Sequence, residues 1–415
     1  MGYIFEKYES EVRSYCRKYP VVFERAVNDT IFSDSGEAYI DFLSVAGSMN
    51  YGHNNPYIKS AILDYLSEDR IINSLDMYTK AKERFIQAFE EEILIPRGMD
   101  YKIMCCGPTG TNAVEAASKL ARKNKGRKNI FAFAGAFHGM TLGSLALTTD
   151  QLSRNGAGVS LNNVTFVPYD GTSYSLDYIK NILSDDHSGI EKPSAMILET
   201  VQAEGGINVA SIDWLKEIRK ICTENDILLI IDEIQVGNGR TGSFFSFERA
   251  DIVPDMVILS KSISGFGLPM SLLLMKRELD IFQPAEHNGT FRGNQLAFVG
   301  GTAAIHYYNE TKLEQKVHLH SKQIETYLKD EISSLDERLS IRGIGMIWGI
   351  DFSHINPSLA MTAVHEAFRN KLIVEVAGRN DSVLKIMPPL TITDETLQNG
   401  LHILQSAVWH ILRGE

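Results

Sequence analysis

Two segments carry side chains whose types and spacing could do chemistry. Lys261 lies just after the apolar run 256–259 and just before the glycine-bearing loop 262–267. The run is too short for most helices and predicts a buried strand, which places Lys261 where that strand ends. Burial lowers the pKa of a lysine, and a neutral amine can attack a carbonyl to form a Schiff base. Taken alone, an ordinary strand-end lysine explains this segment better.

A carboxylate upstream changes that balance. Residues 227–231 are apolar and mostly branched, and Asp232 and Glu233 follow them, a pattern typical of a buried parallel strand with acids at its carboxyl end. Ligands of open α/β sheets bind outside these strand ends, so Asp232 and Lys261 are expected to face one crevice if the strands share a sheet. Pyridoxal phosphate catalysis needs this pair, a lysine for the aldehyde and an aspartate for the pyridine nitrogen. A structural salt bridge is the alternative role for Asp232.

A phosphate site is predicted where Gly110 and Thr111 precede an alanine-rich helical pattern at 113–123. A helix N-terminus offers backbone N–H groups to a phosphate, although an ordinary capped helix would have the same sequence. The string Gly-x-Gly-x-x-Gly at 237–242 could indicate a dinucleotide site instead. That interpretation is weak, because no helical pattern follows the glycines.

Two further loops have polar or aromatic side chains suited to a cofactor. Phe137 and His138 follow the predicted strand 129–133, and an aromatic ring at a strand end can stack on a flat cofactor. A simple core role for Phe137 is the alternative. The segment 287–294, which contains Thr290, is polar and glycine-bearing and is predicted to be a functional loop.

The elements that must position these residues alternate along the chain. Predicted strands cover residues 102–106, 129–133, 164–168, 195–198, 227–231 and 256–259, and predicted helices cover 113–123, 212–224, 297–309 and 314–335. Such alternation implies an α/β fold, with a largely parallel sheet covered by helices on both faces. We expect a large domain at 51–296 and a smaller α/β domain formed by 1–50 together with 297–415.

The bulk properties are those of a globular protein rather than a nucleic-acid or membrane protein. The 415 residues are 44% hydrophobic and 22% charged, with a net charge of −11, whereas a nucleic-acid footprint would be basic. No apolar stretch is long enough to span a bilayer, and charges near the start replace the apolar core of a signal peptide. The four cysteines have no metal spacing, and no metal is expected. These features predict a cytoplasmic protein.

Together, these segments resemble the class III pyridoxal phosphate aminotransferases over nearly the whole chain. The most specific match is the string Asp-Glu-Ile-Gln-Val-Gly-Asn-Gly-Arg-Thr-Gly at 232–242. The resemblance implies a fold-type I transferase with a seven-stranded sheet. It also implies a homodimer or tetramer with active sites at the subunit interface. The cofactor residues that it implies are Gly110 and Thr111 for the phosphate, Phe137 and His138 at the ring, Asp232 for the pyridine nitrogen, Gln235 for the 3-oxygen, Lys261 for the Schiff base, and Thr290 reaching the phosphate from the neighbouring subunit.

Within that family the chain is most similar to the diaminobutyrate–2-oxoglutarate aminotransferases of the ectoine type, in segments 46–56, 75–77, 95–102 and 107–112. The resemblance implies reversible, ping-pong transfer of an amino group from L-glutamate to L-aspartate 4-semialdehyde, catalysed by Lys261 and Asp232. The substrate residues that it suggests are Ala46, Asp76, Glu199, Glu204 and Lys385.

Lys385 departs from the family pattern, since many ω-amino acid members pair the glutamate at position 204 with an arginine. An ammonium cannot make the planar bidentate bond of a guanidinium, and Lys385 could instead be a solvated strand residue. Asp76 could likewise be a helix cap or a surface residue.

Other functions remain open from the sequence. The chief alternative is another ω-aminotransferase, acting on ornithine, 4-aminobutyrate or an amino-sugar aldehyde. A mutase, a decarboxylase or a cofactor-binding protein without transferase activity would use the same scaffold. The combination of Lys261, Asp232 and Gln235 argues against a protein without activity.

Overall fold

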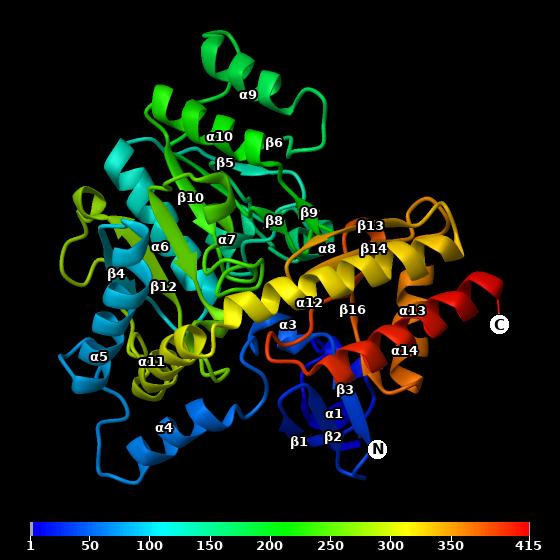
Figure 1. The fold of residues 1–415 in the computed structure, drawn as a ribbon. Coiled ribbons are helices and arrows are strands. Elements are labelled where there is room, and N and C mark those ends of the chain that lie inside the picture. The colour runs from blue at the N-terminus through cyan, green and yellow to red at the C-terminus, as the bar shows by residue number, and fades with distance from the viewer. Residues whose placement is uncertain (1–2, 415) are drawn as a thin grey trace.

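The computed structural model describes residues 3–414 and is built around a seven-stranded sheet (Figure 1). From edge to edge its strands are β4 (Tyr101–Cys105), β12 (Leu272–Lys276), β11 (Met256–Leu259), β10 (Leu228–Asp232), β7 (Ala195–Leu198), β5 (Ile130–Phe133) and β6 (Val164–Val167). Neighbouring strands are parallel except at β12, which is antiparallel to β11 and β4. The predicted α/β fold with a mostly parallel sheet of seven strands is confirmed.

The six predicted strands lie within one residue of their expected bounds, whereas β12 was not predicted. Its run Leu-Leu-Leu-Met is apolar but contains no β-branched or aromatic residue. Leucine and methionine are strong helix formers, so the sequence alone did not indicate a strand.

The strands bury alternate side chains against different helices. Leu228 and Ile230 belong to the same core as α6 (Gly110–Lys125), whereas Leu229 and Ile231 belong to the core that contains α10 (Ile212–Glu224). This period of two, with both sets fully or almost fully buried, is what a parallel strand covered on both faces requires. The carboxyl ends of the strands are therefore the edge left for a ligand.

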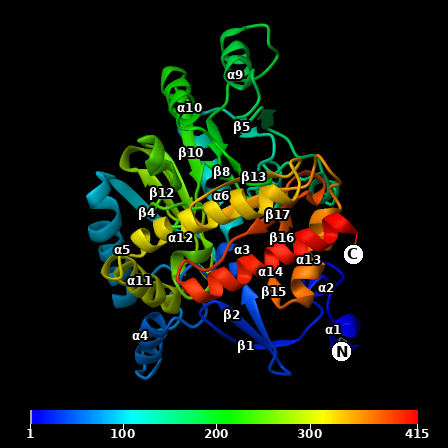
Figure 2. The same ribbon diagram turned by 45° about the vertical axis from the view of Figure 1, so that its right-hand side comes forward.

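The chain forms two smaller four-stranded sheets, one of which joins its two ends. One contains β1 (Phe23–Val27), β2 (Thr30–Ser33), β3 (Ala38–Asp41) and β15 (Leu372–Ile373), and the other contains β13 (Ser340–Ile344), β14 (Ile347–Asp351), β17 (Val383–Ile386) and β16 (Glu375–Ala377). Strand β15 pairs in parallel with β3, so N-terminal and C-terminal segments share one sheet. Figure 2 shows the N-terminal strands close to the C-terminal helices. The smaller domain expected at 1–50 and 297–415 includes residues 1–2 and 415, which lie outside the residues that the structure describes.

The other described elements connect and cover these sheets. They are α1 (Tyr3–Tyr8), α2 (Tyr15–Lys18), α3 (Ser44–Gly47), α4 (Pro56–Leu66), α5 (Lys80–Phe89), α7 (Leu142–Leu145), α8 (Gln151–Asn155), α9 (Ser175–Ser184), the hairpin strands β8 (Val201–Gln202) and β9 (Asn208–Val209), α11 (Gln295–Glu310), α12 (Leu313–Tyr327), α13 (Leu359–Arg369) and α14 (Asp394–Arg413). In Figure 1, α12 runs from the large sheet toward β13 and β14.

The helix predicted at 314–335 is not regular throughout. Beyond α12 the chain forms a wider π turn at Leu328–Ile332 and then a 3₁₀ turn at Ser333–Leu335. Ile324, Leu328 and Ile332 are all fully buried at a spacing of four residues. A regular α-helix has 3.6 residues per turn, so the wider turn keeps these side chains on one face.

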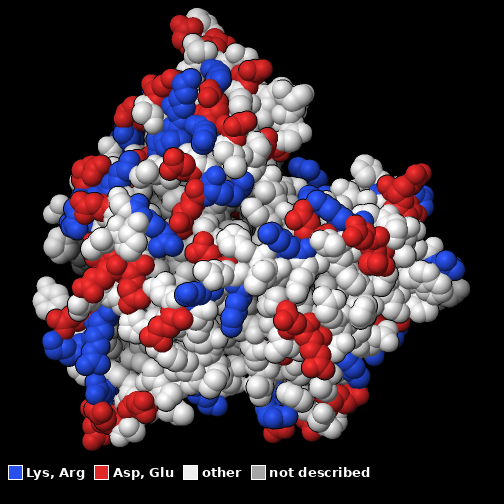
Figure 3. All heavy atoms as spheres, in the orientation of Figure 1, with Lys and Arg blue, Asp and Glu red and all other residues white. Residues whose placement is uncertain are grey.

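The surface carries both signs of charge. Figure 3 shows basic and acidic side chains interspersed over the face seen in Figure 1. Among the helices formed by residues 3–414, none has both the length and the apolar character needed to cross a membrane.

Candidate active site

Asp232 and Lys261 lie together because their strands are neighbours. Asp232 ends β10, which pairs in parallel with β11, and Lys261 begins a 3₁₀ turn (Lys261–Ser264) directly after Ser260. The backbone of Lys261 is left-handed, with φ of +52°, a conformation that costs energy and is concentrated at functional sites. Both side chains line one cavity at the carboxyl ends of the strands.

Most of the site residues predicted from the sequence line this cavity. They are Gly110, Thr111, Phe137, His138, Glu199, Glu204, Asp232, Gln235 and Lys261. The cavity is completed by Gly139, Ile234, Val236 and Ser260, which were not singled out from the sequence. Ile234 stands between Asp232 and Gln235 in the string that carries the family resemblance, and this was the one signal that could have found it.

The N-terminus of α6 forms the predicted phosphate end of the cavity. Thr111 Oγ1 lies 2.6 Å from Thr141 Oγ1, which fixes the Thr111 hydroxyl at the start of the helix. A Cβ on Gly110 would come within 2.8 Å of Ile234, so the glycine leaves room at this point. The first N–H groups of a helix have no partner within the helix, and together with the hydroxyl they suit an anion.

Asp232 is held in place by His138. His138 Nδ1 lies 2.8 Å from Asp232 Oδ2, and both side chains are almost completely buried. Asp232 Oδ1 accepts a hydrogen bond of 3.0 Å from the Ile234 backbone N–H. The carboxylate therefore has a fixed orientation in which it can accept a hydrogen bond from a protonated ring nitrogen.

The electrostatics of the cavity favour a reactive amine. Burial lowers the pKa of Lys261, against the opposing effect of Glu204. No hydrogen bond or ion pair joins the Lys261 amine to another residue of 3–414, so it is free to react. Burial and then the charge of Asp232 raise the pKa of Glu199 well above its usual value, and Glu199 Oε2 accepts a hydrogen bond of 3.2 Å from the Phe137 N–H.

Gln235 connects the ring end of the cavity to the substrate end. Its Nε2 donates to Glu204 Oε1 and to the Ala46 carbonyl oxygen, each at 3.1 Å, while its buried Oε1 has no hydrogen-bond partner in the described chain. Ala46 belongs to the turn α3, in which Ser44, Val45 and Ala46 all have positive φ near +50°. Ala46 does not line the cavity itself and contributes through its backbone.

Lys385 is buried and paired, so the alternative of a solvated strand residue is wrong. Its side chain is 1% exposed and its Nζ lies 2.8 Å from Glu204 Oε1 and 3.1 Å from Glu375 Oε2. Burial lowers the pKa of Lys385, but the two carboxylates outweigh burial and raise it above its usual value. Burial raises the pKa of Glu204, but Lys385 and Lys261 outweigh it and lower that pKa to about 2. Glu375 was not predicted, because nothing in its local sequence points to the site.

Two predicted residues lie outside the cavity of this single chain. Thr290 is exposed in the loop before α11. Asp76 is exposed as well, and its backbone carbonyl accepts a hydrogen bond of 2.8 Å from Lys82 Nζ. Neither residue touches the groups described above.

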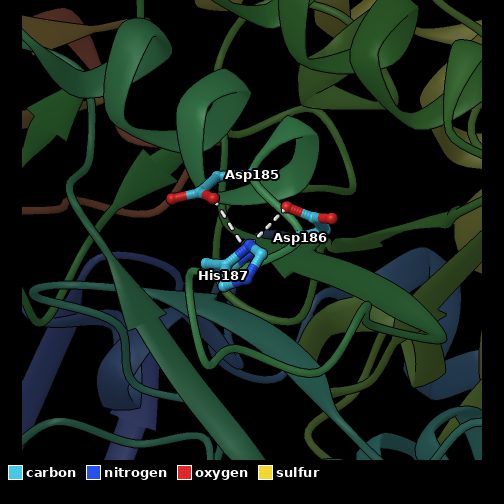
Figure 4. A group of neighbouring side chains, drawn as sticks. All are labelled: Asp185, Asp186 and His187. Atoms are coloured by element: carbon cyan, nitrogen blue, oxygen red, sulfur yellow. Dashed lines mark hydrogen bonds and ion pairs between the residues drawn. The ribbon is translucent and has the colours of Figure 1, made fainter.

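One group of metal-ligating side chains occurs among residues 3–414. Asp185, Asp186 and His187 are consecutive, exposed residues that follow α9, and Figure 4 shows their side chains turned toward one another. His187 Nδ1 lies 2.7 Å from Asp186 Oδ1. This group shares no residue with the cavity and lacks the buried, supported ligands of a built metal site.

The cavity fits pyridoxal phosphate. Two buried polar atoms of residues that line it, Gln235 Oε1 and His138 Nε2, have no hydrogen-bond partner within the described chain. A Cβ on Gly139 would lie 2.6 Å from Thr111 Oγ1, so a side chain there would crowd the phosphate end. A free amine, a fixed carboxylate and a helix N-terminus match an aldehyde, a ring nitrogen and a phosphate.

Comparison with known proteins gives full-length matches. Residues 13–408 match the family described as aminotransferase class-III. The diaminobutyrate–2-oxoglutarate transaminase of Marinococcus halophilus is 50% identical over 410 residues, which cover 98% of this chain and 96% of that protein. The protein of the same name from Bordetella parapertussis is 48% identical over 418 residues, covering 99% of this chain and 96% of its own.

Solved structures agree with the fold. Ornithine aminotransferase of Toxoplasma gondii, described with partial occupancy of PLP at its active site, superposes with a TM-score of 0.87. The alignment covers 99% of this chain and 94% of that chain, at 24% sequence identity. A likeness at this identity shows the shared fold and nothing about the substrate.

Proposed function

The chain belongs to the class III aminotransferases, and we propose that it transfers an amino group from L-glutamate to L-aspartate 4-semialdehyde. The products are L-2,4-diaminobutyrate and 2-oxoglutarate, and the cycle is reversible and ping-pong. The family and its diaminobutyrate branch, both predicted from the sequence, are confirmed by the two relatives. The observation that carries the chemistry is the free amine of Lys261 facing the fixed carboxylate of Asp232 in one cavity.

The cofactor is pyridoxal 5′-phosphate, which when bound supplies an aldehyde for the amino group and a ring that accepts electrons. Gly110 and Thr111 would hold the phosphate at the N-terminus of α6. Asp232, oriented by His138, would bind the protonated ring nitrogen, and Phe137 would cover a ring face. Gln235 would contact the ring oxygen, and its Oε1, which has no hydrogen-bond partner within the described chain, supports this role.

Lys261 carries the proton transfers. Its lowered pKa leaves a larger neutral fraction than a surface lysine has, and a neutral amine can act as a general base. We propose that Lys261 Nζ removes the proton from the substrate carbon that bears the amino group and would deliver it to the aldehyde carbon of the cofactor, so that the amino group can leave the substrate.

Glu204 and Lys385 would separate the two substrates. Glutamate brings a carboxylate on its reacting carbon, whereas the reacting carbon of diaminobutyrate carries none. With diaminobutyrate, Glu204 remains paired with Lys385, as in the structure. With glutamate, the substrate carboxylate takes the place of Glu204 on the ammonium. The raised pKa of Lys385 keeps that ammonium charged in both cases.

We also propose a homodimer in the cytoplasm. Tyr78 is 99% exposed and Phe291 is 65% exposed, which indicates a surface covered by a partner. Their two segments lie together, since Asn73 bridges to Asn294, and Thr290 next to Phe291 could then reach the partner's phosphate site. All four cysteines are unpaired, which is typical of a reducing compartment.

An absorbance scan tests the substrate and the chemistry together. L-2,4-diaminobutyrate, added without a keto acid, should remove the yellow colour of the Lys261-bound cofactor, and 2-oxoglutarate should restore it. Ornithine and 4-aminobutyrate are the matched controls. A response to one of these and not to diaminobutyrate would contradict the substrate and favour another ω-aminotransferase. A protein that cannot be charged with pyridoxal phosphate would contradict the proposal as a whole.

A further inference from the structure

Lys385 has a second carboxylate partner that the switch between substrates does not account for. Glu375 on β16 and Lys385 on β17 are directly opposed in the antiparallel register. Side chains of opposed residues lie on the same face, and here Glu375 Oε2 lies 3.1 Å from Lys385 Nζ. Two strands of one sheet thus hold this ion pair in place.

The two carboxylates on Lys385 differ in how they are held. Glu375 is 4% exposed and its Oε1 accepts a hydrogen bond of 2.8 Å from the Tyr15 hydroxyl, donated from α2. Glu204 is 29% exposed and lies in the turn of the β8–β9 hairpin, where it lines the cavity. One carboxylate is fixed by a sheet, and the other lies on a turn that can release it.

Because Lys385 is buried, its ammonium needs a second carboxylate partner while a substrate carboxylate replaces Glu204. Its side chain is 1% exposed, and a buried ammonium without a counter-charge is strongly unfavourable. If Glu204 were its sole partner, withdrawal of Glu204 would leave that charge uncompensated. The neighbouring Glu375 removes this obstacle, because one carboxylate stays on the ammonium throughout.

We propose that Glu375 is a positioning residue that keeps Lys385 charged and in place each time Glu204 withdraws to admit the carboxylate of glutamate. This rests on the proposed function, since only an enzyme that alternates between glutamate and an ω-amine must empty and refill the position of Glu204. Among the described residues lining the cavity, Lys261 is the only lysine or arginine. Lys385 does not line the cavity itself, but its ammonium lies 2.8 Å from Glu204 Oε1, so an incoming carboxylate can reach it when Glu204 withdraws.

The variant Glu375→Gln keeps the size of the side chain and removes its charge. The two half-reactions are followed separately by the absorbance of the bound cofactor. We expect the apparent KM for glutamate to rise at least tenfold, because Glu204 becomes locked on Lys385. The half-reaction with L-2,4-diaminobutyrate should change less than threefold, because Glu204 stays in place there.

Binding without turnover gives a second readout. Glutarate, an unreactive dicarboxylate, should bind at least tenfold more weakly to Glu375→Gln, measured by its effect on the cofactor absorbance. Glu375→Asp retains the charge and should recover most of the affinity. Glu395→Gln, an exposed carboxylate on α14, is the matched control and should bind glutarate like the parent.

A variant of Glu204 tests the locking directly. Glu204→Gln leaves Glu375 on the ammonium and removes the carboxylate that must withdraw, so glutarate should bind at least as tightly as it binds the parent. Equal slowing of both half-reactions by Glu375→Gln, or weaker glutarate binding by Glu204→Gln, would overturn the proposal. If the parent enzyme prefers another ω-amine to diaminobutyrate, that amine takes its place in the same comparison. That result would contradict diaminobutyrate as the substrate, and the comparison of half-reactions would still test the role of Glu375.

Discussion

Replacing Lys385 by methionine should destabilise the folded protein strongly at pH 7. Methionine keeps the length and apolar stem of the lysine but removes its charge. Glu204 and Glu375 would then be two carboxylates near one another without the ammonium that lies 2.8 Å and 3.1 Å from them. Removing one partner of a buried ion pair leaves an uncompensated charge and costs about 3–5 kcal/mol.

The pKa of Glu204 gives an independent magnitude. Its usual value of 4.5 is lowered to about 2 in the folded protein. One pKa unit corresponds to about 1.4 kcal/mol, so the surroundings of Glu204, with Lys385 as the largest favourable partner, stabilise its charged form by roughly 3 kcal/mol at neutral pH. The Glu204 carboxylate is 29% exposed and partly screened by water, which favours the lower end of the range. We therefore expect a loss of about 3 kcal/mol.

The loss of stability caused by Lys385→Met should become smaller as the pH falls. Because the folded-state pKa of Glu204 is lowered, its contribution is present above pH 4.5 and is lost as the pH falls through that value toward 2. In the variant, Lys385 no longer opposes the effect of burial on Glu204, so the folded-state pKa of Glu204 rises and the folded form binds a proton more readily than the folded parent does. The variant regains stability on acidification, so its difference from the parent narrows between pH 7 and pH 5.

Urea unfolding at fixed protein and cofactor concentration measures these differences. Lys371→Met is the matched control, because Lys371 pairs with Glu37 at 2.6 Å but both side chains are 41% or more exposed. That control should change the free energy of unfolding by less than about 1 kcal/mol. If Lys385→Met costs no more than the control, or costs the same at pH 7 and pH 5, the reasoning about the buried ammonium is refuted.

Three further substitutions test the cofactor end of the cavity. Asp232→Asn keeps the contact with His138 but removes the charge, and kcat should fall by about 10²–10³-fold in steady-state assays; an unchanged kcat would contradict the role of Asp232. Gly139→Ala puts a Cβ 2.6 Å from Thr111 Oγ1 at φ of +124°, and strain of about 1–3 kcal/mol should weaken cofactor binding at least tenfold in a titration. Lys261→Ala should abolish turnover while some cofactor still binds; normal turnover would exclude Lys261 as the reacting amine.

The fold was predictable because its signals are local. The runs at 195–198 and 256–259 match β7 and β11 in both bounds, since a short, fully apolar run between helical patterns is typical of a buried strand. Strand β12 was missed because leucines suit helices as well as strands. The helix at 314–335 was predicted as regular because periodicity does not show where a turn widens.

The candidate site was predictable where a chemically suitable side chain directly follows a predicted strand. Asp232 and Lys261 each follow an apolar run, and parallel strands bring their carboxyl ends to one edge of the sheet. Thr290 and Asp76 are exposed in the single chain, and the sequence cannot say which surface a second copy would bring to them.

The sequence by itself predicted six of the seven strands of the large sheet, most of the residues that line the cavity, and the family, because each depends on side chains close together in the chain or on a short specific string. Only the tertiary structure decided the state of Lys385. Its burial depends on β14 and β16 packing on either side of β17, and its partners come from positions 204 and 375. Register between strands and desolvation of a charge arise from contacts between distant segments, and no local pattern encodes them.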